Sequence, residues 1–286
     1  MTGIIIKGIG GFYYVKAEDS NIYECKARGI FRKENIKPCI GDRVEISLEN
    51  GKGSIEKIET RRTVLVRPPV SNIDNLMIVV ASMNPDPDFL LIDKMLVTAE
   101  KKGIVPIICV NKTDLDSGEK IKDIYKNTGY KILSVSTYEK EGIDELKALL
   151  KYKITAFAGT SGVGKSSILN ELIDESAQTG EISDKIKRGK HTTRHVELFE
   201  LEGGGFILDT PGFSSYELED IPATELSTFF PEMANVTETC RFKGCAHINE
   251  PDCAIKEKVR LGEISQTRYE NYISIYEILK DRKEWK

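Results

Sequence analysis

The order of two short motifs constrains this chain more than any other feature of its sequence. The tetrapeptide Asn111-Lys112-Thr113-Asp114 comes first, and the glycine-rich segment Gly159-Thr160-Ser161-Gly162-Val163-Gly164-Lys165-Ser166 follows it. The second segment matches the pattern G-x-x-x-x-G-K-S, which is typical of loops that hold nucleotide phosphates. Nucleotide-binding domains of the usual kind carry this loop ahead of the tetrapeptide. We therefore expect an α/β nucleotide-binding fold whose chain is circularly permuted.

The glycine-rich segment has the residues that phosphate binding requires. Glycines let successive backbone N–H groups approach phosphate oxygens. Lys165 is expected to reach the β- and γ-phosphates, and the hydroxyl of Ser166 to ligate Mg²⁺. The loop follows the apolar run Ile154–Ala158 and opens a helix near Lys165, whose dipole also favours an anion. The predicted phosphate contacts are Gly159, Thr160, Ser161, Gly162, Val163, Gly164, Lys165, Ser166 and Ser167.

A further magnesium ligand is expected at Asp209. The sequence Asp209-Thr210-Pro211-Gly212 ends the apolar run Phe206–Leu208 and lies downstream of the phosphate loop. By itself Asp-Thr-Pro-Gly is a common turn, but at this place it is typical of a GTPase. Asp209 is expected to hold Mg²⁺ through water, and the N–H of Gly212 to contact the γ-phosphate.

The tetrapeptide predicts which base is bound. A carboxylate accepts hydrogen bonds, and guanine offers it two donors, N1–H and the 2-amino group, that adenine does not. Asp114 is therefore expected to select guanine, Lys112 to cover the face of the base with its aliphatic stem, and Asn111 to tie this loop to the phosphate loop. Thr113 belongs to the same loop, and the backbone around Ser136 is expected to complete the pocket. These motifs together predict a circularly permuted GTPase.

The polar segment from Gly180 to Arg194 is expected to carry the last magnesium ligand. It contains Gly189-Lys190-His191-Thr192-Thr193-Arg194. One threonine of this run should close over Mg²⁺ when GTP is bound. Thr193 is favoured, and Thr192 stays an alternative.

The catalytic group is less clearly marked. Phe213 stands where many GTPases place the glutamine that orients the attacking water, and a phenyl ring cannot do this. Hydrolysis must then be slow, or another group or a partner must help. His191 is the nearest candidate in the sequence. An exposed loop histidine without a catalytic role is the alternative.

A cluster of cysteines predicts a metal site near the C-terminus. The pattern Cys240-x4-Cys245-x-His247-x5-Cys253 offers three thiolates and one imidazole. Zinc takes four such ligands in a tetrahedron, and a full protein ligand set leaves no position for water. We therefore expect a structural zinc site. It should pin the C-terminal helices, because the loop itself holds few apolar residues.

Composition and cysteine usage describe a soluble globular protein, with 40% hydrophobic and 30% charged residues. No apolar run is long enough to span a bilayer, and the N-terminus has no signal-peptide pattern. Cys25, Cys39 and Cys109 are scattered, and a chain of this size without a secretion signal is not expected to carry a disulfide framework. We expect a cytoplasmic monomer with no membrane partner.

The first 68 residues are expected to form an OB-fold barrel. Five short runs separated by turn-like segments predict strands at Ile4–Lys7, Phe12–Ala17, Ile22–Ala27, Arg43–Leu48 and Ser54–Ile58. Arg61 to Pro69 is expected to be a linker, because paired prolines cannot continue a strand ladder.

The barrel is also a candidate RNA-binding surface. Residues 1–68 carry 13 Lys and Arg against 9 Asp and Glu, although ordinary surface charge explains this balance equally well. The candidate stacking residues, half of them expected to be core, are Phe12, Tyr13, Tyr14, Tyr23 and Phe31. The candidate phosphate contacts are Arg28, Arg32, Lys33 and Lys37.

From Asn75 onward, strand-like and helix-like segments alternate along the sequence. This pattern predicts a doubly wound α/β sheet with one antiparallel pair. The expected elements are Asn75–Ala81, Phe89–Lys102, Ile104–Val110, Ile121–Asn127, Lys131–Val135, Ile143–Leu150, Ile154–Ala158 and the hairpin Val196–Leu201 with Phe206–Asp209. Beyond Gly212, helices are expected at Ala223–Phe230 and Ser265–Lys283. The expected domains are residues 1–68 (OB-fold), 72–220 (permuted GTPase) and 221–286 (helical, zinc-binding).

Together these features resemble the RsgA (YjeQ) family of bacterial GTPases that depend on the small ribosomal subunit. The resemblance rests on the barrel, the rotated motif order, the run Gly189–Thr193, the sequence Asp209–Phe213 and the cysteine–histidine pattern. It implies an OB-fold, a permuted GTPase domain and a zinc-binding helical domain. It also implies action late in small-subunit maturation, rRNA binding, and release on GTP hydrolysis. Lys190 stands where many relatives have arginine, a minor change because both are cationic.

Two classes of function stay open. The favoured one is a GTP hydrolase that times assembly of the small ribosomal subunit. The other is a GTP-gated RNA-binding module whose hydrolysis is incidental. A signalling GTPase without RNA is disfavoured by the barrel and the cysteine cluster, and an ATPase is disfavoured by Asp114.

Overall fold

The computed structural model describes residues 1–49, 52–65, 69–174, 196–209, 218 and 221–281. Contacts divide the chain into two compact units. The first unit comprises Met1–Met77, Ile143–Ala158 and Lys165–Gly212, and the second comprises Ile78–Gly142, Gly159–Gly164 and Phe213–Lys286. Among the described residues, no helix is both long and apolar enough to cross a membrane.

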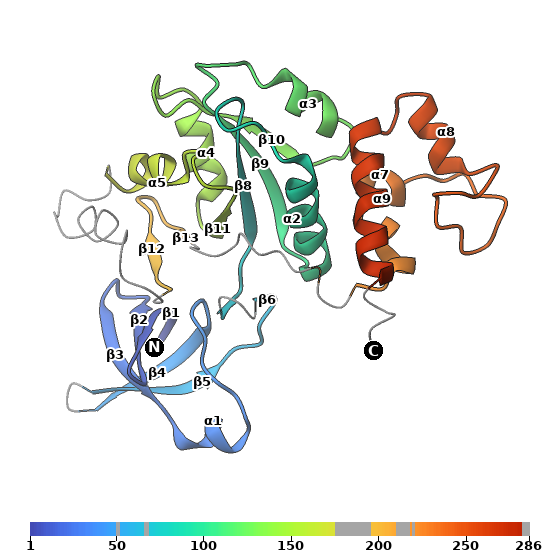
Figure 1. The fold of residues 1–286 in the computed structure, drawn as a ribbon. Coiled ribbons are helices and arrows are strands. Elements are labelled where there is room, and N and C mark those ends of the chain that lie inside the picture. The colour runs from blue at the N-terminus through green and yellow to red at the C-terminus, as the bar shows by residue number, and fades with distance from the viewer. Residues whose placement is uncertain (50–51, 66–68, 175–195, 210–217, 219–220, 282–286) are drawn as a thin grey trace. The chain divides into compact units, whose positions relative to one another are not determined.

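The chain begins with a closed barrel in the strand order β1-β2-β3-β5-β4 (Figure 1). Its elements are β1 (Thr2–Ile9), β2 (Phe12–Ala17), β3 (Ile22–Ala27), α1 (Gly29–Lys33), β4 (Arg43–Glu49) and β5 (Lys52–Ile58). β3 runs parallel to β5, while the β1–β2, β2–β3, β4–β5 and β1–β4 pairs are antiparallel. This is the predicted OB-fold; β2 and β3 match their predicted ranges, and β1, β4 and β5 are slightly longer than predicted. The short helix α1 was not foreseen.

Alternate residues of the strands fill the barrel. Val15, Val44 and Ile55 are fully buried in its core. Phe31 of α1 lies in the same core and is only 6% exposed, so the expectation that it could stack on RNA is wrong. Phe31 is the one residue of α1 in the described barrel core, whereas Ile30 beside it is 51% exposed.

The segment expected to be a linker is more structured than that. Strand β6 (Val64–Leu65) pairs antiparallel with β7 (Val70–Ser71), and Pro69 lies in the turn between them. The hydroxyl of Ser71 donates to the buried carboxylate of Asp42 in the barrel, at 2.6 Å. Prolines do interrupt a ladder, but here the pairing forms on either side of them.

A mixed sheet follows, with the strand order β10-β9-β8-β11-β13-β12 in the described part of the chain. Its strands are β8 (Asn75–Ala81), β9 (Val105–Asn111), β10 (Lys131–Ser134), β11 (Ile154–Ala158), β12 (Leu198–Glu200) and β13 (Phe206–Asp209). β10 runs parallel to β9 and β11 parallel to β13, whereas β12 pairs antiparallel with β13. This confirms the doubly wound sheet with one antiparallel pair.

The helices of this region begin and end near the predicted residues. They are α2 (Phe89–Lys102), α3 (Glu119–Tyr125), α4 (Ile143–Leu150) and α5 (Lys165–Asp174). Helix α2 matches its predicted range because both ends carry local signals. The carboxylate of Asp88 accepts from the Leu91 N–H at 2.9 Å, and Gly103 ends the helix with a left-handed φ of 64°.

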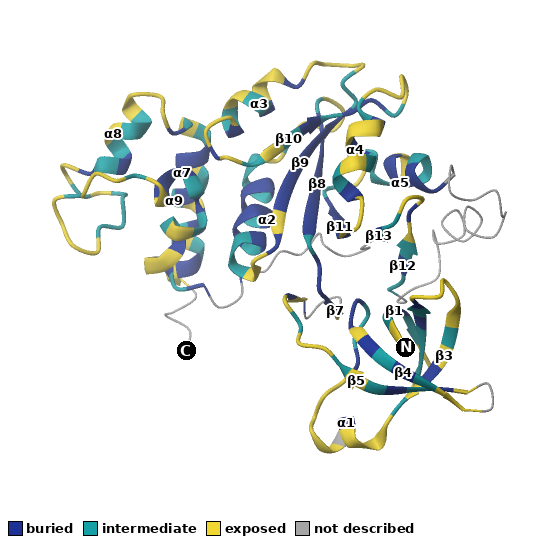
Figure 2. Cartoon of the chain, turned by 180° about the vertical axis from the view of Figure 1, so that it is seen from behind, coloured by how far each residue is buried: buried dark blue, intermediate teal, exposed yellow. Residues whose placement is uncertain are grey.

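The C-terminal region is helical but less regular than predicted. Its elements are the 3₁₀ helix η1 (Ala223–Phe229), α7 (Pro231–Ala234), α8 (Ala254–Arg260) and α9 (Gln266–Asp281). The helix expected at residues 223–230 is present as a 3₁₀ helix over residues 223–229, and Pro231 starts a new helix directly after it. Val97 of α2 shares one core with Leu226, Phe230 and Ile275, so this region packs on α2 (Figure 2).

Candidate functional site

The predicted base loop lies at the carboxyl end of β9, where Asn111 is the last strand residue and is 1% exposed. Its side-chain Nδ2 donates to the carbonyl oxygen of Val163 at 2.9 Å. The tie between the two motifs that the sequence predicts is therefore present in the structure. The Oδ1 atom of Asn111 is buried and makes no hydrogen bond within the described residues, which leaves it an acceptor for a further donor.

Two glycines of the phosphate loop are sterically required. A Cβ on Gly164 would lie 2.1 Å from Nδ2 of Asn111, and a Cβ on Gly159 would lie 2.3 Å from the Val79 carbonyl oxygen. Both residues also have positive φ angles, 95° and 140°. Only glycine allows the backbone to pass this close to its neighbours while it keeps that conformation.

Asp114 is oriented by a serine at the end of the neighbouring strand. The hydroxyl of Ser136 donates to Oδ1 of Asp114 at 2.7 Å, and the N–H of Glu139 donates to the Ser136 hydroxyl at 3.0 Å. Ser136 is fully buried, whereas Asp114 is exposed. The sequence predicts a backbone role for Ser136. The structure shows that its side chain binds one carboxylate oxygen, and the other oxygen has no hydrogen bond to any residue that the structure describes.

Lys112 is held in a conformation that lysine rarely adopts. Its φ is 63°, in the left-handed region, and its Nζ donates to the carbonyl oxygen of Asn84. Ser82 contacts the backbone on both sides of it. Sequence reasoning missed Ser82 and Asn84. The available signal was that they follow β8, because the ends of parallel strands share one edge of a sheet.

Of the remaining predicted nucleotide contacts, Thr113, Thr160, Ser161 and Gly162 lie in the second unit, and the others lie in the first unit or outside the described residues. Lys165, Ser166 and Ser167 form the first turn of α5, with both serines exposed. Asp209 ends β13, and its backbone pairs with Phe157 of β11, the strand that precedes the phosphate loop. The described residues do not include His191, Thr192, Thr193, Gly212 and Phe213.

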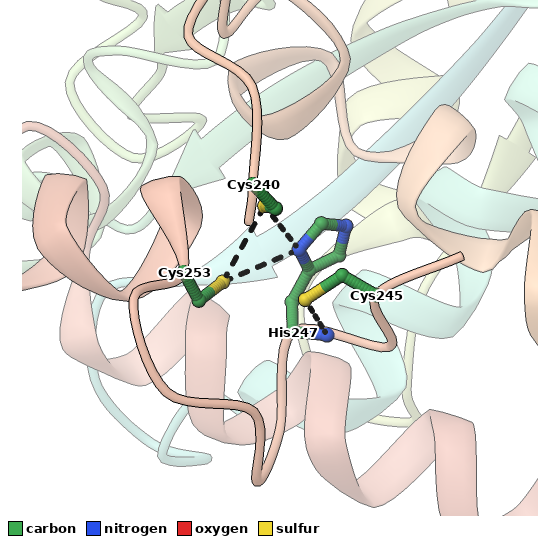
Figure 3. A group of neighbouring side chains, drawn as sticks. All are labelled: Cys240, Cys245, His247 and Cys253. Carbon is green, nitrogen blue, oxygen red and sulfur yellow. Dashed lines mark hydrogen bonds between the residues drawn. The ribbon is translucent and has the colours of Figure 1, made fainter. Parts of the chain in front are cut away.

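The four predicted metal ligands come together (Figure 3). Nδ1 of His247 lies 3.5 Å from Sγ of Cys240 and 3.4 Å from Sγ of Cys253, and these two sulfurs are 3.8 Å apart. All four ligand atoms, with Sγ of Cys245, lie within 4.8 Å of one another. Around a tetrahedral zinc ion two sulfurs stand about 3.8 Å apart, and a sulfur and a nitrogen about 3.5 Å. The donor set and its spacing fit zinc.

The loop that carries these ligands is fixed by α9 and by one carboxylate. The hydroxyl of Tyr269 donates to the His247 carbonyl oxygen at 2.6 Å, and that of Tyr272 to the Ala246 carbonyl oxygen at 2.9 Å. Glu250 accepts from the N–H groups of Ala246 and Ile248. Backbone hydrogen bonds of this kind lower the pKa of Glu250 to about 2. The loop of predicted ligands is thus also held by groups that are not themselves predicted ligands.

Many of the barrel's candidate RNA contacts are engaged within the barrel. The Tyr14 hydroxyl donates to Glu24, the Tyr23 hydroxyl donates to Asp19, and Nζ of Lys26 lies 4.8 Å from the Phe12 ring centroid. Tyr13 is half-buried against the core. Arg28 pairs with Glu56, whereas Lys33 and Lys37 are exposed. The side chain of Arg32 is outside the described part.

Sequence profiles of two known domains match this chain. The profile described as RsgA GTPase matches residues 58–219, and the one described as RsgA N-terminal domain matches residues 2–55. The chain belongs to the RsgA GTPase family. The resemblance seen in the motifs is confirmed.

Curated relatives match along nearly their whole length. A protein of Ruminiclostridium cellulolyticum named small ribosomal subunit biogenesis GTPase RsgA is 48% identical, over 99% of this chain and 95% of that protein. A protein of the same name from Agathobacter rectalis is 47% identical over 100% of both chains. The match therefore includes the barrel, the GTPase motifs and the cysteine cluster.

Solved structures agree with the fold. The crystal structure of YjeQ from Thermotoga maritima has a TM-score of 0.85 and 37% identity, and covers 97% of this chain and 98% of that one. The structure of YloQ, described as a circularly permuted GTPase, has a TM-score of 0.83 and 37% identity, over 98% and 95% of the two chains. The permuted order read from the motifs is thus shared by a solved relative.

Proposed function

We propose that this chain is a GTP hydrolase that acts in biogenesis of the small ribosomal subunit, binds its rRNA late in maturation and leaves when GTP is hydrolysed. The observation that carries the proposal is the hydrogen bond from Asn111 to the Val163 carbonyl oxygen, which joins a guanine motif to a phosphate loop in the permuted order. Family membership supports the same reading.

We assign the guanine base to Asp114, Lys112 and Asn111. The Asp114 oxygen left open by Ser136 is available to the N1–H and 2-amino donors. The N–H groups of residues 159–164 and the side chain of Lys165 would bind the phosphates. Magnesium, bound with the nucleotide, would be ligated by Ser166, Asp209 and Thr193 or Thr192.

We assign a structural zinc ion to Cys240, Cys245, His247 and Cys253. The spacing of the ligand atoms supports this, and so does burial, which lowers the pKa of His247 and favours the neutral imidazole that a metal requires. The ion would hold the ligand loop against α9. We also propose three domains: a barrel over residues 1–68, a GTPase domain over residues 72–220 and a zinc-binding domain over residues 221–286.

The proposal is tested by co-sedimentation of the full chain with purified small ribosomal subunits. We expect binding with a non-hydrolysable GTP analogue, weak binding with GDP, and no nucleotide dependence in Lys165→Ala. Equal binding with all nucleotides would contradict release on hydrolysis.

The alternative, a GTP-gated RNA-binding module with incidental hydrolysis, is favoured by Phe213 in place of a glutamine. It predicts that release follows exchange of GTP for GDP even when hydrolysis is blocked.

A further inference from the structure

Ser82, the first residue after β8, anchors both peptide groups that flank the Cα atom of Lys112. Its N–H donates to the Asn111 carbonyl oxygen at 2.9 Å, and its hydroxyl donates to the Lys112 carbonyl oxygen at 2.7 Å. These carbonyls belong to the peptide planes before and after Lys112. One residue therefore fixes both backbone torsions of the lysine.

Lys112 needs such an anchor because its backbone is strained. Its φ of 63° lies in the left-handed region, which is unfavourable for a residue with a Cβ. Lysine has no short polar side chain that could compensate locally, as asparagine has. The Leu115 N–H also donates to the Lys112 carbonyl oxygen at 2.9 Å, which forms a turn but leaves the preceding peptide plane free.

The same segment also directs the lysine side chain. Nζ of Lys112 donates to the carbonyl oxygen of Asn84, two residues beyond Ser82. The aliphatic stem therefore runs back along residues 82–84. Ser82 sets where the stem begins, and the Asn84 carbonyl sets where it ends.

We propose that Ser82 is a positioning residue for guanine nucleotides, which acts by presenting the stem of Lys112 to the face of the purine. The inference rests on the proposed guanine site. In this arrangement the loop after β9 is held from both neighbouring strands, by Ser82 after β8 and by Ser136 after β10. The two serines have different tasks: Ser136 orients the carboxylate that reads the base edge, and Ser82 orients the side chain that covers the base face.

This division of tasks can be measured with GDP and IDP. Inosine keeps N1–H but lacks the 2-amino group, so it differs from guanine at the edge and not at the face. We expect Ser82→Ala to raise the Kd of the full chain for GDP and for IDP by the same factor, about three- to tenfold for one lost hydrogen bond. Ser136→Ala should instead raise the Kd for GDP more than the Kd for IDP. Ser82→Thr, which keeps the hydroxyl, should restore affinity for both.

A double-mutant cycle shows whether Ser82 acts through Lys112. If it does, Ser82→Ala combined with Lys112→Ala binds GDP no more weakly than Lys112→Ala alone. Additive losses would overturn the inference, and so would a Ser82→Ala variant that binds both nucleotides as the native chain does. Should Ser82→Ala fail to fold, Ser82→Cys removes the strong donor at nearly constant size and takes its place. A native chain that binds neither nucleotide would defeat the proposed function itself.

Discussion

Nη1 of Arg268 in α9 lies 2.6 Å from Oδ1 of Asp93 in α2, and both side chains are almost completely buried. The same guanidinium donates from Nε and Nη2 to the two carboxylate oxygens of Glu232, at 2.7 and 3.0 Å. The Cζ atom of this guanidinium also lies 4.4 Å from the ring centroid of Phe230. One buried arginine therefore joins the helix that follows β8 to the C-terminal helices.

Removal of this guanidinium should destabilise the second unit strongly. Arg268→Met leaves two carboxylates buried without a cation, which costs about 3–5 kcal/mol of unfolding free energy. Urea unfolding measures the loss. Arg260→Met is the matched control, because Arg260 is exposed and pairs with Glu257 within α8. That change should cost less than about 1 kcal/mol of unfolding free energy. Equal effects of the two changes would contradict this account of the buried cluster.

The buried cluster should also make stability depend on pH. It holds two carboxylates and one guanidinium, and burial raises the pKa of Asp93 against the opposing effect of Arg268. A carboxyl with a raised pKa in the folded state binds its proton more tightly there than in the unfolded chain. Its contribution is therefore fully present below the ordinary Asp pKa and is lost as pH rises through the raised value.

The measurement compares the native chain with Asp93→Asn, which cannot titrate. We expect the difference in unfolding free energy to move in favour of the native chain as pH falls from 7 to 5. A difference that stays constant, or that moves the other way, would contradict a raised pKa of Asp93 in the folded state.

Metal removal should unfold the C-terminal region and spare the barrel. The predicted ligands come from the loop that α9 holds through Tyr269 and Tyr272, and Cys253→Ser removes one of them at nearly constant size. We expect amide hydrogens of α8 and α9 to lose protection, with a loss of at least about 3 kcal/mol, and β1–β5 to be unaffected. Hydrogen exchange with and without a chelator tests this. Cys39→Ser, outside the cluster, is the control and should change nothing in α8 or α9.

Gly164→Ala should abolish the tie between the phosphate loop and the base loop. The new Cβ would lie 2.1 Å from Nδ2 of Asn111, so the loop must shift and the bond to Val163 is lost. We expect GDP affinity to fall at least about tenfold, equivalent to 1.4 kcal/mol. Gly129→Ala is the matched control, since it has a positive φ of 79° but no atom within 4 Å of the added Cβ. Native GDP affinity in Gly164→Ala would disprove the steric argument.

The sequence predicted those features that depend on neighbouring residues. The limits of α2 follow from Asp88 and Gly103, which cap the helix locally. The cysteine–histidine cluster follows from spacing within 14 residues of chain, Cys240 to Cys253. The order of the nucleotide motifs predicted the permuted fold, because each motif carries its own chemistry.

Features that depend on distant pairs were not predictable in this way. Arg268 and Asp93 are 175 residues apart, and nothing local marks either as buried. Nothing in the sequence near Ser82 indicates its contacts with Asn111 and Lys112, because they form only when β8 and β9 lie side by side. Phe31 was one of five aromatics that could stack on RNA or belong to the core, and only the fold shows that it belongs to the barrel core. In each case the partner that gives the residue its role is brought in only by the fold.

The most direct test of the account is steady-state GTP hydrolysis by the full chain with and without purified small ribosomal subunits, with ATP as the control nucleotide. Phe213 cannot orient the attacking water, so the chain alone should be slow and the subunit should accelerate GTP hydrolysis on the order of 10²-fold or more, with no effect on ATP. A rate of GTP hydrolysis that the subunit leaves unchanged would contradict the proposed function.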